Sequence, residues 1–451
     1  MVSKDRYALP EGWVWTKLGE ICEKPQYGWT TSANFNGKGL KLLRTTDISS
    51  GTIDWSTVPF CKQEPDEPKK YLLKKGDILV SRAGSVGVSI EIDNCPKAIF
   101  ASYLIRFKPI SPIPSRYISL YLKSRYYWDS IADNIAGITT PNVNASKLRT
   151  LQIPLPPLNE QKRIIRKIEN LFTRLNKTKQ ELAKISSILK KFRQSVLTKA
   201  FSGELTKDWR EQQKDLEPAS KLLERIREER KKKLGKKYKE PEPIDTSDLL
   251  ELPEGWEWVR LVDVCFFEYG EGLPKDKRIK GKIPVYGSNG IVGYHNKCYI
   301  KGPAIIVGRK GSFGKVNKSE TDCWPIDTTY YITEDSTLVD FDFLYFLLMN
   351  LRLDEYDRST AIPGLNREEA HSKIIALPPI QEQREIVKKI NELYNKADTI
   401  EKSIKIAQAH CEKLSQSILV KAFRGELVEQ DPNDEPAERL LTRVMRKKEN
   451  G

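Results

Sequence analysis

The residues most able to do chemistry are spread thinly along this chain. Its seven cysteines never occur as Cys-x-x-Cys, which is typical of reduced thiols and not of a zinc site. None of the three histidines, His295, His371 and His410, has a neighbour that could share a metal ion. Three residues resemble part of a nuclease site but are better explained by an acidic, proline-rich loop: Glu64, Asp66 and Lys69. We predict no metal centre and no catalytic residue.

Two glycine-rich stretches also fail as nucleotide-binding sites. Residues 311–316 lack the Walker spacing and have no Ser or Thr after Lys315. Residues 84–87 lack the three-glycine spacing of a dinucleotide loop, so we interpret them as a turn. An amino-methyltransferase would carry Asn/Asp-Pro-Pro-aromatic to hold a flipped base, but here the Pro-Pro pairs precede Leu158 and Ile380. We expect this chain to bind no cofactor.

Length and composition indicate several globular domains. A chain of 451 residues with 39% hydrophobic residues is expected to form about two to four domains. Its apolar runs are too short to span a membrane, and residues 1–7 show no apolar signal region, so we expect a cytosolic protein. The formal charge of +15 favours a polyanionic partner, because Lys and Arg that meet phosphates release counterions.

The chain repeats four motifs in the same order. Leu-Pro-Glu-Gly-Trp begins at residues 9 and 252, and a Pro-Pro-x-x-Glu-Gln motif begins at 156 and 378. Lys-Ala-Phe-x-Gly-Glu-Leu begins at 199 and 421, and Glu-Pro-Ala begins at 217 and 435. The second and third motifs share one offset of 222 residues (157 to 379, and 200 to 422), whereas the first is offset by 243 (9 to 252). Each half is therefore predicted to be a variable globular unit followed by a connector of fixed length.

Both connectors are predicted to be long helices. Apolar residues recur in alternating steps of four and three from Ile164 to Val196, broken only by Thr178, and again from Ile386 to Ile418. Such a narrow stripe needs a partner, and antiparallel pairing of the two helices is the favoured arrangement; two helices that each lie on their own domain are the alternative.

The first connector is strongly basic. It carries twelve Lys or Arg and three Glu between Asn159 and Ala200, so we expect it to contact DNA or a partner protein. We expect reversal of three of its cations to weaken assembly or DNA binding: Lys190, Lys191 and Arg193.

The globular units are predicted to be mixed α/β. Residues 77–82 and 102–107 have the pattern of strands, and residues 116–134 that of one amphipathic helix. In the second half, strands are expected at 304–307 and 328–333 and a helix near 341–356. A basic stretch at 225–239 is interpreted as a solvated linker helix.

This layout resembles the specificity subunit of type I restriction–modification enzymes over nearly the whole chain. The resemblance rests on the paired Leu-Pro-x-Gly-Trp openings, the Pro-Pro-x-x-Glu-Gln helix starts and the Lys-Ala-Phe-x-Gly-Glu-Leu ends. It implies a pseudo-twofold α+β fold with two target recognition domains separated by two helices that form an antiparallel coiled coil. The implied segments are recognition domains at 1–155 and 251–377, spacer helices at 156–205 and 378–427, a charged linker with a short helix at 206–250 and a C-terminal tail or short helix at 428–451.

The resemblance also implies a function without catalysis in this chain. Each recognition domain would read one half of an asymmetric, bipartite site in double-stranded DNA. Two modification subunits would bind S-adenosylmethionine and methylate adenine N6, and restriction subunits would add ATP- and Mg-dependent translocation and cleavage. Two alternatives stay open: a specificity subunit whose methyltransferase and nuclease partners are fused, and a coiled-coil scaffold that binds no DNA.

Polar loops between strands are the predicted DNA contacts, because base edges are read by Arg, Asn, Gln and hydroxyl groups. In the first unit the candidates are Lys41, Arg44, Thr45, Arg82, Ser85, Thr139, Thr140 and Asn142. In the second unit they are Tyr286, Ser288, Asn289, Arg309, Lys310, Ser312, Asn366 and Arg367. Asn366 and Arg367 are placed as the counterparts of Asn142.

Overall fold

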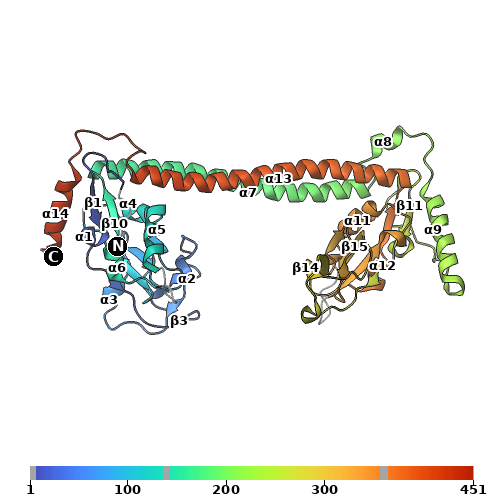
Figure 1. Cartoon of the computed structure of the whole chain (residues 1–451), viewed down its shortest axis with the longest axis horizontal. Coiled ribbons are helices and arrows are strands. Elements are labelled where there is room, and N and C mark those ends of the chain that lie inside the picture. Colours follow the sequence, from blue (N-terminus) through green and yellow to red (C-terminus); the bar gives the residue numbers. More distant parts are fainter. Residues whose placement is uncertain (1–6, 136–141, 356–363, 450–451) are drawn as a thin grey trace. The chain divides into compact units, whose positions relative to one another are not determined.

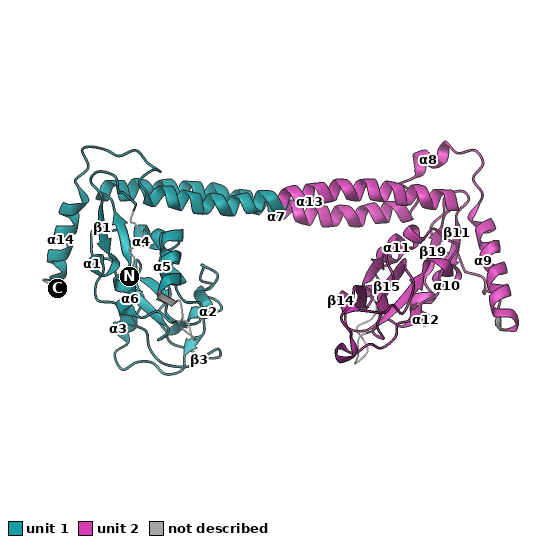
Figure 2. Ribbon diagram, viewed as in Figure 1, with its two compact units in different colours: residues 1–183, 405–451 teal, residues 184–404 magenta. Residues whose placement is uncertain are grey.

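The protein has the mixed α/β fold that the sequence predicts. The computed structural model describes residues 7–135, 142–355 and 364–449. It divides into two compact units, unit 1 of residues 1–183 and 405–451 and unit 2 of residues 184–404 (Figure 2). Each unit combines one globular domain with one half of each long helix, so the units cut across the linear segments implied by the resemblance. Among the described residues, no helix is long and apolar enough to cross a membrane.

The described residues of unit 1 form ten strands, accompanied by short helices (Figure 1). Its strands are β1 (Val14–Lys17), β2 (Gln26–Tyr27), β3 (Ala33–Asn34), β4 (Lys41–Leu43), β5 (Phe60–Cys61), β6 (Ile78–Ser81), β7 (Ser89–Glu91), β8 (Ala98–Phe100), β9 (Leu104–Phe107) and β10 (Gln152–Leu155). Its shorter helices are α1 (Leu18–Ile21), α2 (Thr45–Ile48), α3 (Pro68–Tyr71), α4 (Ser115–Tyr121), α5 (Arg125–Ile135), α6 (Ala145–Arg149) and α14 (Ala437–Glu449).

Unit 2 repeats much of this order. Its strands are β11 (Glu257–Arg260), β12 (Glu268–Tyr269), β13 (Ile283–Gly287), β14 (Gly290–His295), β15 (Ala304–Gly308), β16 (Val316–Ser319), β17 (Trp324–Pro325), β18 (Thr329–Thr333) and β19 (Ile374–Leu377). Its shorter helices are α8 (Lys207–Glu211), α9 (Ala219–Leu234), α10 (Leu261–Val264), α11 (Phe341–Asn350) and α12 (Arg367–His371), with 3₁₀ turns η1 (Gly235–Lys237), η2 (Lys275–Lys277), η3 (Glu334–Ser336) and η4 (Leu353–Glu355). The long helices α7 (Leu158–Phe201) and α13 (Ile380–Phe423) each contribute to both units.

The two domains share one sheet and differ in another. The strand order β2-β9-β6-β7 in unit 1 matches β12-β18-β15-β16 in unit 2, and the pair β1–β10 matches β11–β19. The second sheet has the order β3-β5-β4-β8 in unit 1 but β14-β13-β17 in unit 2, although both contain one parallel pair, β4–β8 and β13–β17. The internal repeat is therefore confirmed for the sheets β2-β9-β6-β7 and β12-β18-β15-β16, which we call the main sheets. The domains diverge in the sheets β3-β5-β4-β8 and β14-β13-β17, which we call the smaller sheets.

The single helix predicted at residues 116–134 is wrong in detail. The structure has two helices, α4 and α5, interrupted by a turn at residues 122–124. Ser124 is fully buried there, and its hydroxyl accepts a hydrogen bond from the backbone amide of Tyr127 at 3.4 Å. Serine at this position favours a new helix start over a continuous helix, and the amphipathic pattern alone did not reveal this.

Within each unit the two long helices pack antiparallel, as predicted. In unit 1, Arg163 near the start of α7 reaches the carbonyl of Glu429 beyond the end of α13, and Lys179 pairs with Glu412 at 2.7 Å. In unit 2, Lys389 donates to the carbonyl of Leu205, which follows the end of α7. The alternative of two helices that each lie only on their own domain is therefore wrong.

One of the cations predicted to contact DNA or a partner protein, Arg193, instead takes part in contacts between the two long helices. Arg193 forms ion pairs with Asp398 at 2.6 Å and Glu401 at 2.9 Å, and Tyr394 donates to its carbonyl. Lys190 and Lys191 are exposed. Reversal of Arg193 would consequently disturb the helix pair itself, whereas the two lysines belong to the outer surface.

The apolar seam between the two long helices is only partly buried. Ile164, Ile168, Ile386 and Ile390 are fully buried at the helix starts, inside the two domain cores. Farther along, the seam residues Ile185, Phe192, Ile400 and Leu414 remain exposed. Leu189, Ala397 and Ile404 are buried along the same stretch, so the helix pair covers part of the seam and leaves the rest open to solvent.

All four repeated motifs meet at one junction in each unit. In unit 2 the indole Nε1 of Trp256 donates to the buried carboxylate of Glu382 at 2.8 Å, and the amide of Gln383 donates to the carbonyl of Pro378. The backbone amide of Ala219, from Glu-Pro-Ala, donates to the carbonyl of Gly255 at 2.9 Å. The Lys-Ala-Phe-x-Gly turn completes the junction, since Gly203 lies against Trp256.

Unit 1 builds the same junction from both ends of the chain. Trp13 donates to Glu160 at 3.0 Å, and the amide of Ala437 donates to the carbonyl of Gly12 at 2.8 Å. The segment implied as a C-terminal tail or short helix thus packs in the core of unit 1, where Leu440 and Val444 of α14 are fully buried. The basic linker helix α9 packs in the same way on unit 2.

We expect Trp256→Phe to lower the free energy of unfolding by about 2 kcal/mol, because it removes a hydrogen bond to a buried carboxylate. Trp258→Phe is the matched control: this indole is only partly buried and donates to the carbonyl of Leu250 at 3.3 Å. Its loss should cost less than about 1 kcal/mol. Urea unfolding of the full chain measures both, and equal losses would contradict a special role for the junction.

Candidate nucleic-acid interface

A cationic corner lies at the end of the main sheet of unit 2. Arg309 directly follows β15, and its guanidinium stacks over the rings of Tyr269 at 5.1 Å and Tyr330 at 6.0 Å. Arg367, the first residue of α12, stacks over Tyr269 at 5.0 Å and over Phe266 at 5.0 Å. These side chains line a pocket of about 310 Å³ together with Lys310 and residues 364–368. The predicted residues Arg309, Lys310, Asn366 and Arg367 are thus brought together.

The backbone fixes the walls of this corner. The amide of Leu365 donates to the carbonyl of Arg309 at 2.9 Å, and Lys310 forms a β-bridge with Gly364. The hydroxyl of Tyr330 donates to the carbonyl of Leu365 at 3.0 Å. Burial raises the pKa of Tyr330 to about 12, so this hydroxyl keeps its proton. The arginines therefore stack on rings that are themselves held by hydrogen bonds.

Unit 1 has the same corner with one arginine fewer. Arg82 directly follows β6 and stacks over Tyr27 at 5.0 Å. The amide of Val143 donates to the carbonyl of Arg82, Ala83 forms a β-bridge with Asn142, and the hydroxyl of Tyr27 accepts a hydrogen bond from the amide of Ala145. The structure therefore brings two of the predicted residues, Arg82 and Asn142, together.

Sequence reasoning missed the signals for these corners. Arg-x-Gly-Ser-x-Gly occurs at residues 82–87 and again at 309–314, and Tyr-Gly occurs at 27–28 and 269–270. The glycines that open and close both turns, including Gly84 and Gly311, have positive φ, which explains why the motif needs glycine. Neither Tyr27 nor Tyr269 was among the predicted residues.

The stacked arginines differ from a structural arginine in the same sheet. Arg106 is buried and donates to Asp77, Gln26 and two carbonyls, so its donors are largely used within the fold. For Arg82 and Arg309, no side-chain hydrogen bond or ion pair to another described residue is found, whereas both terminal nitrogens of Arg106 have partners. Nε is buried without a partner in Arg82 and Arg106 alike. Their remaining donors are available to an external acceptor.

The predicted residues near the smaller sheets have other local roles. Lys41 donates to the carbonyl of Val58, and Arg44 forms a 2.6 Å ion pair with Asp47 while stacking over the exposed ring of Phe35. Thr45 begins α2. Within the described ranges, no hydrogen bond, ion pair or cation–π contact joins these three residues to Arg82.

In the corresponding loop of unit 2, two of the three predicted residues are buried within the fold. Tyr286 and Ser288 are buried, and the hydroxyl of Ser288 donates to the carbonyl of Thr328 at 2.7 Å. Asn289 is exposed and accepts from Lys315 at 2.5 Å. Two exposed turn residues, Ser85 and Ser312, occupy the same place in the repeated Arg-x-Gly-Ser-x-Gly turns. Asn289 and the two serines remain accessible from outside.

The predicted match of Asn366 with Asn142 is wrong by two residues. Asn366 caps α12 by accepting from the amides of Glu368 and Glu369, just as Asn144 caps α6 by accepting from Lys147. The counterpart of Asn142 in the β-bridge is Gly364. Thr139 and Thr140 lie outside the described residues.

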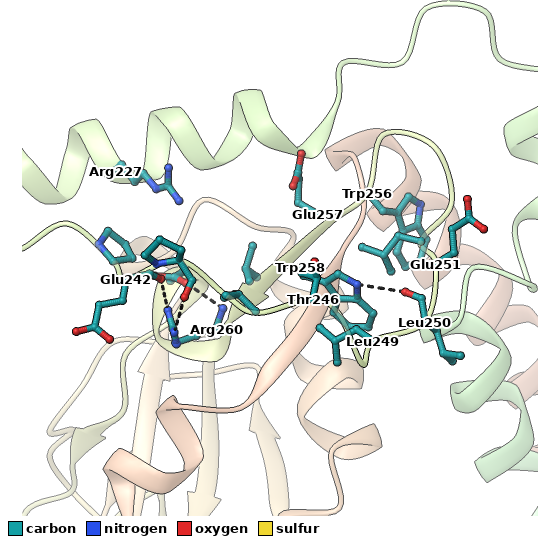
Figure 3. A pocket seen from close by; sticks show the side chains of 16 residues that line it. Arg227, Glu242, Thr246, Leu249, Leu250, Glu251, Trp256, Glu257, Trp258 and Arg260 are labelled. Carbon is teal, nitrogen blue, oxygen red and sulfur yellow. Dashed lines mark hydrogen bonds between the residues drawn. The ribbon is translucent and has the colours of Figure 1, made fainter.

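A larger pocket in unit 2 offers no comparable chemistry. Its volume is about 710 Å³, and it lies between β11 and residues 241–252 (Figure 3). Arg260 donates to the carbonyls of Glu242 and Pro243, and Trp258 donates to that of Leu250. These contacts hold the segment against the strand. Within the described ranges, no group of three or more potential metal ligands occurs either.

Comparison with known proteins identifies the class to which this fold and these corners belong. Residues 10–187 and 253–408 match the type I restriction modification DNA specificity domain, and the chain belongs to that family. The EcoDI specificity subunit of Escherichia coli is 30% identical over 87% of this chain and 89% of its own length. The EcoKI specificity subunit of Escherichia coli strain K12 is 27% identical over 94% and 90%. Such subunits are a non-catalytic component of type I restriction–modification systems, and this chain is one of that class.

Solved structures show the same fold. The HsdS subunit from Thermoanaerobacter tengcongensis aligns with a TM-score of 0.51 and 20% identity, covering 93% of this chain and 98% of that one. A chain from a structure of complex assembly and conformational transition in a type I R-M system aligns with a TM-score of 0.67 and 19% identity, covering 93% and 100%.

A buried histidine supports the corner of unit 2. Nε2 of His371 accepts a hydrogen bond from the amide of Phe267 at 3.0 Å, and its ring packs against Phe266, over which Arg367 stacks. Burial is the main reason that the pKa of His371 falls to about 4. The neutral ring is therefore the form that holds this wall of the corner.

The lowered pKa of His371 predicts acid sensitivity. The unfolded chain binds the proton near its ordinary pKa of 6.5, so stability that is present above that pH is lost as the pH falls towards 4. The expected loss at about pH 5 is on the order of 2 kcal/mol. His371→Gln keeps an acceptor without the titration and should lose that part of the pH dependence. Urea unfolding at about pH 7 and pH 5 tests this, with exposed His410→Gln as the control; an unchanged slope in His371→Gln would exclude the assignment.

Proposed function

We propose that each unit reads one half of an asymmetric, bipartite site in double-stranded DNA and so directs adenine-N6 modification and restriction subunits to it. The observation that carries this proposal is the repeated corner in which Arg82 or Arg309 stacks on a tyrosine and keeps donors free of described acceptors. Membership of the DNA specificity family supports it.

The corner suits base readout in physical terms. A guanidinium presents a planar set of donors that matches the two acceptors on the major-groove edge of guanine. Stacking on Tyr27 or Tyr269 restricts the plane of that group before DNA arrives, which lowers the entropy lost on binding. The adjoining smaller sheets differ between the units, so we infer that the two half-sites have different sequences.

The long helices are the proposed docking surface for two modification subunits. Ile188 on α7 is 60% exposed, and Ile406 on α13 is 58% exposed, although neither belongs to the predicted seam. Large apolar side chains exposed on a helix pair are expected at a protein interface. We propose that S-adenosylmethionine, ATP and Mg are bound by the partner subunits and that the assembled complex works in the cytoplasm.

Mapping N6-methyladenine in a host that co-expresses this chain with its modification subunit tests the function. We expect a split, asymmetric methylation motif that disappears when this chain is omitted. A palindromic motif that depends on this chain would contradict two different half-sites, and assembly without any methylation motif would favour a scaffold.

Single substitutions should separate the two half-sites. We expect Arg82→Ala to relax methylation specificity in one half-site and Arg309→Ala in the other, with a loss of about 1–3 kcal/mol in binding of the cognate duplex. Arg125→Ala, at an exposed residue of α5, is the matched control. Fluorescence anisotropy with duplexes altered in either half measures the effect. Equal weakening on all duplexes, with a smaller salt dependence, would show phosphate contacts instead.

The docking surface can be tested without DNA. Ile188→Glu places a charge on the exposed apolar surface and should weaken binding of the modification subunit by about tenfold or more. Ser187→Glu adds the same charge at the neighbouring exposed position and should have little effect. Calorimetric titration with the purified modification subunit measures both affinities. Similar affinities for the two variants would place the interface elsewhere.

A further inference from the structure

The junction of unit 1 contains a buried carboxylate with an unused oxygen. Glu160 is 1% exposed, and its Oε2 accepts from the indole of Trp13 at 3.0 Å. Its Oε1 is buried and has no hydrogen-bond partner. An unsatisfied buried carboxylate oxygen costs free energy, so a native structure that keeps one needs an explanation.

The junction of unit 2 shows what completes such a carboxylate. There Oε2 of Glu382 accepts from Trp256, while Oε1 accepts from the hydroxyl of Thr206 at 2.6 Å and from Nη1 of Arg210 at 2.5 Å. The same guanidinium donates to the carbonyl of Gly203 at 3.0 Å and lies 5.9 Å from the ring of Trp256. A guanidinium thus satisfies the carboxylate, a glycine carbonyl and a tryptophan face at once.

Unit 1 does not have the residues that do this. Between the Lys-Ala-Phe-x-Gly-Glu-Leu motif and Glu-Pro-Ala it has seven residues where unit 2 has eleven, and its described residues contain no counterpart of α8. Gln430 approaches Gly425 in the way that Arg210 approaches Gly203, but no hydrogen bond of its amide reaches Glu160. The glycine, the tryptophan and the carboxylate remain, and the cation is missing.

An open pocket takes the place of the missing side chain. It has a volume of about 400 Å³, and Trp13, Glu160, Gln430 and Pro432 are among the residues that line it. Its other ionisable lining residues are all acidic: Glu11, Asp431, Asp434 and Glu438. The nearby cation Arg163 does not line the pocket and is paired with Asp434 at 2.7 Å. Burial raises the pKa of the Glu160 carboxyl, and Arg163 and Trp13 oppose that rise.

We propose that this pocket of unit 1 binds the guanidinium of an arginine side chain supplied by another protein chain, in the place that Arg210 occupies within unit 2. Arginine fits because its planar donors can reach a carboxylate and a carbonyl together while its face lies on an indole. A lysine ammonium is a compact point charge and cannot make the same set of contacts. This inference concerns the junction and does not rest on DNA recognition.

The indole N–H groups of the two junction tryptophans report directly on occupancy. We would label the full chain with ¹⁵N-tryptophan, assign Trp13 and Trp256 by Phe substitution, and titrate N-acetyl-L-arginine amide. The matching lysine and citrulline derivatives are titrated at equal ionic strength. The Trp13 signal should shift saturably with the arginine derivative alone, and Glu160→Gln should weaken that response at least about tenfold, as expected when a buried charge pair is lost.

Unit 2 supplies the matched control. In the native chain Trp256 should not respond, because Arg210 already fills its junction. In Arg210→Ala the vacated site should make Trp256 sensitive to the arginine derivative. A response of Trp256 in that variant together with a silent Trp13 would overturn the proposal, and so would equal responses to the arginine and lysine derivatives.

Two further variants identify the source of the guanidinium. Gln430→Arg places a guanidinium beside Gly425, as Arg210 lies beside Gly203, and should abolish the response of Trp13. Arg6 of this chain lies outside the described residues; a Trp13 signal that responds only after Arg6→Gln would show that the chain fills its own pocket, against supply by another protein. Glu160→Gln should weaken binding of the modification subunit if that subunit is the donor, and unchanged affinity together with an intact arginine response would assign the donor to a different protein chain.

Discussion

A buried glutamate in the first turn of each long helix, held by a tryptophan indole, is the interaction on which both units depend. The positive end of the helix dipole favours a carboxylate there, but burial requires that its oxygens also find donors. Trp13 and Trp256 come from the segment that precedes the first strand of each domain, so the hydrogen bond ties that segment to the helix start. Gln161 and Gln383 bind the prolyl carbonyls just before the helix and so fix the direction in which it leaves the domain.

The repeated motifs could be identified in the sequence, but the contacts between them could not be predicted. Spacing and heptad periodicity predicted both helices, their pairing and a duplicated fold. They could not show that Ala437 docks on Gly12 while Ala219 docks on Gly255, because that choice depends on which ends of the antiparallel helices come together. The segment predicted as a tail or short helix therefore contributes α14 to the core of the first unit. The sequence likewise could not show that Arg193 is used within the helix pair, because its partners Asp398 and Glu401 lie 205 and 208 residues away.

The cationic corners could be predicted only in part. Arg82 and Arg309 were identifiable as loop cations after apolar strands, but the tyrosines beneath them lie on β2 and β12, each only two residues long. Strands that short carry no periodicity, and the arginine and tyrosine are 40 or more residues apart, so only the fold brings them together. The predicted match of Asn142 with Asn366 failed for a related reason. Asn366 caps α12, whereas the β-bridge that Asn142 forms in unit 1 is formed in unit 2 by the nearby Gly364.

The two copies share the contacts that stabilise each junction and differ in the parts of the globular domains that would contact a ligand. The offsets of 243 and 222 residues show that the larger change in length, 21 residues, falls between the opening motif and the helix start, within the globular domain. None of the junction contacts uses a residue of the smaller sheets, so those sheets can change without removing the tryptophan–glutamate bond. Among the described residues, the junction of unit 1 leaves two buried oxygens without a partner, Oε1 of Glu160 and Oε1 of Gln161, whereas the matching oxygens of Glu382 and Gln383 accept hydrogen bonds. Because the second copy shows that the same junction can satisfy its glutamate internally through Arg210, the open oxygen in the first copy is not a requirement of the fold and points to an external partner.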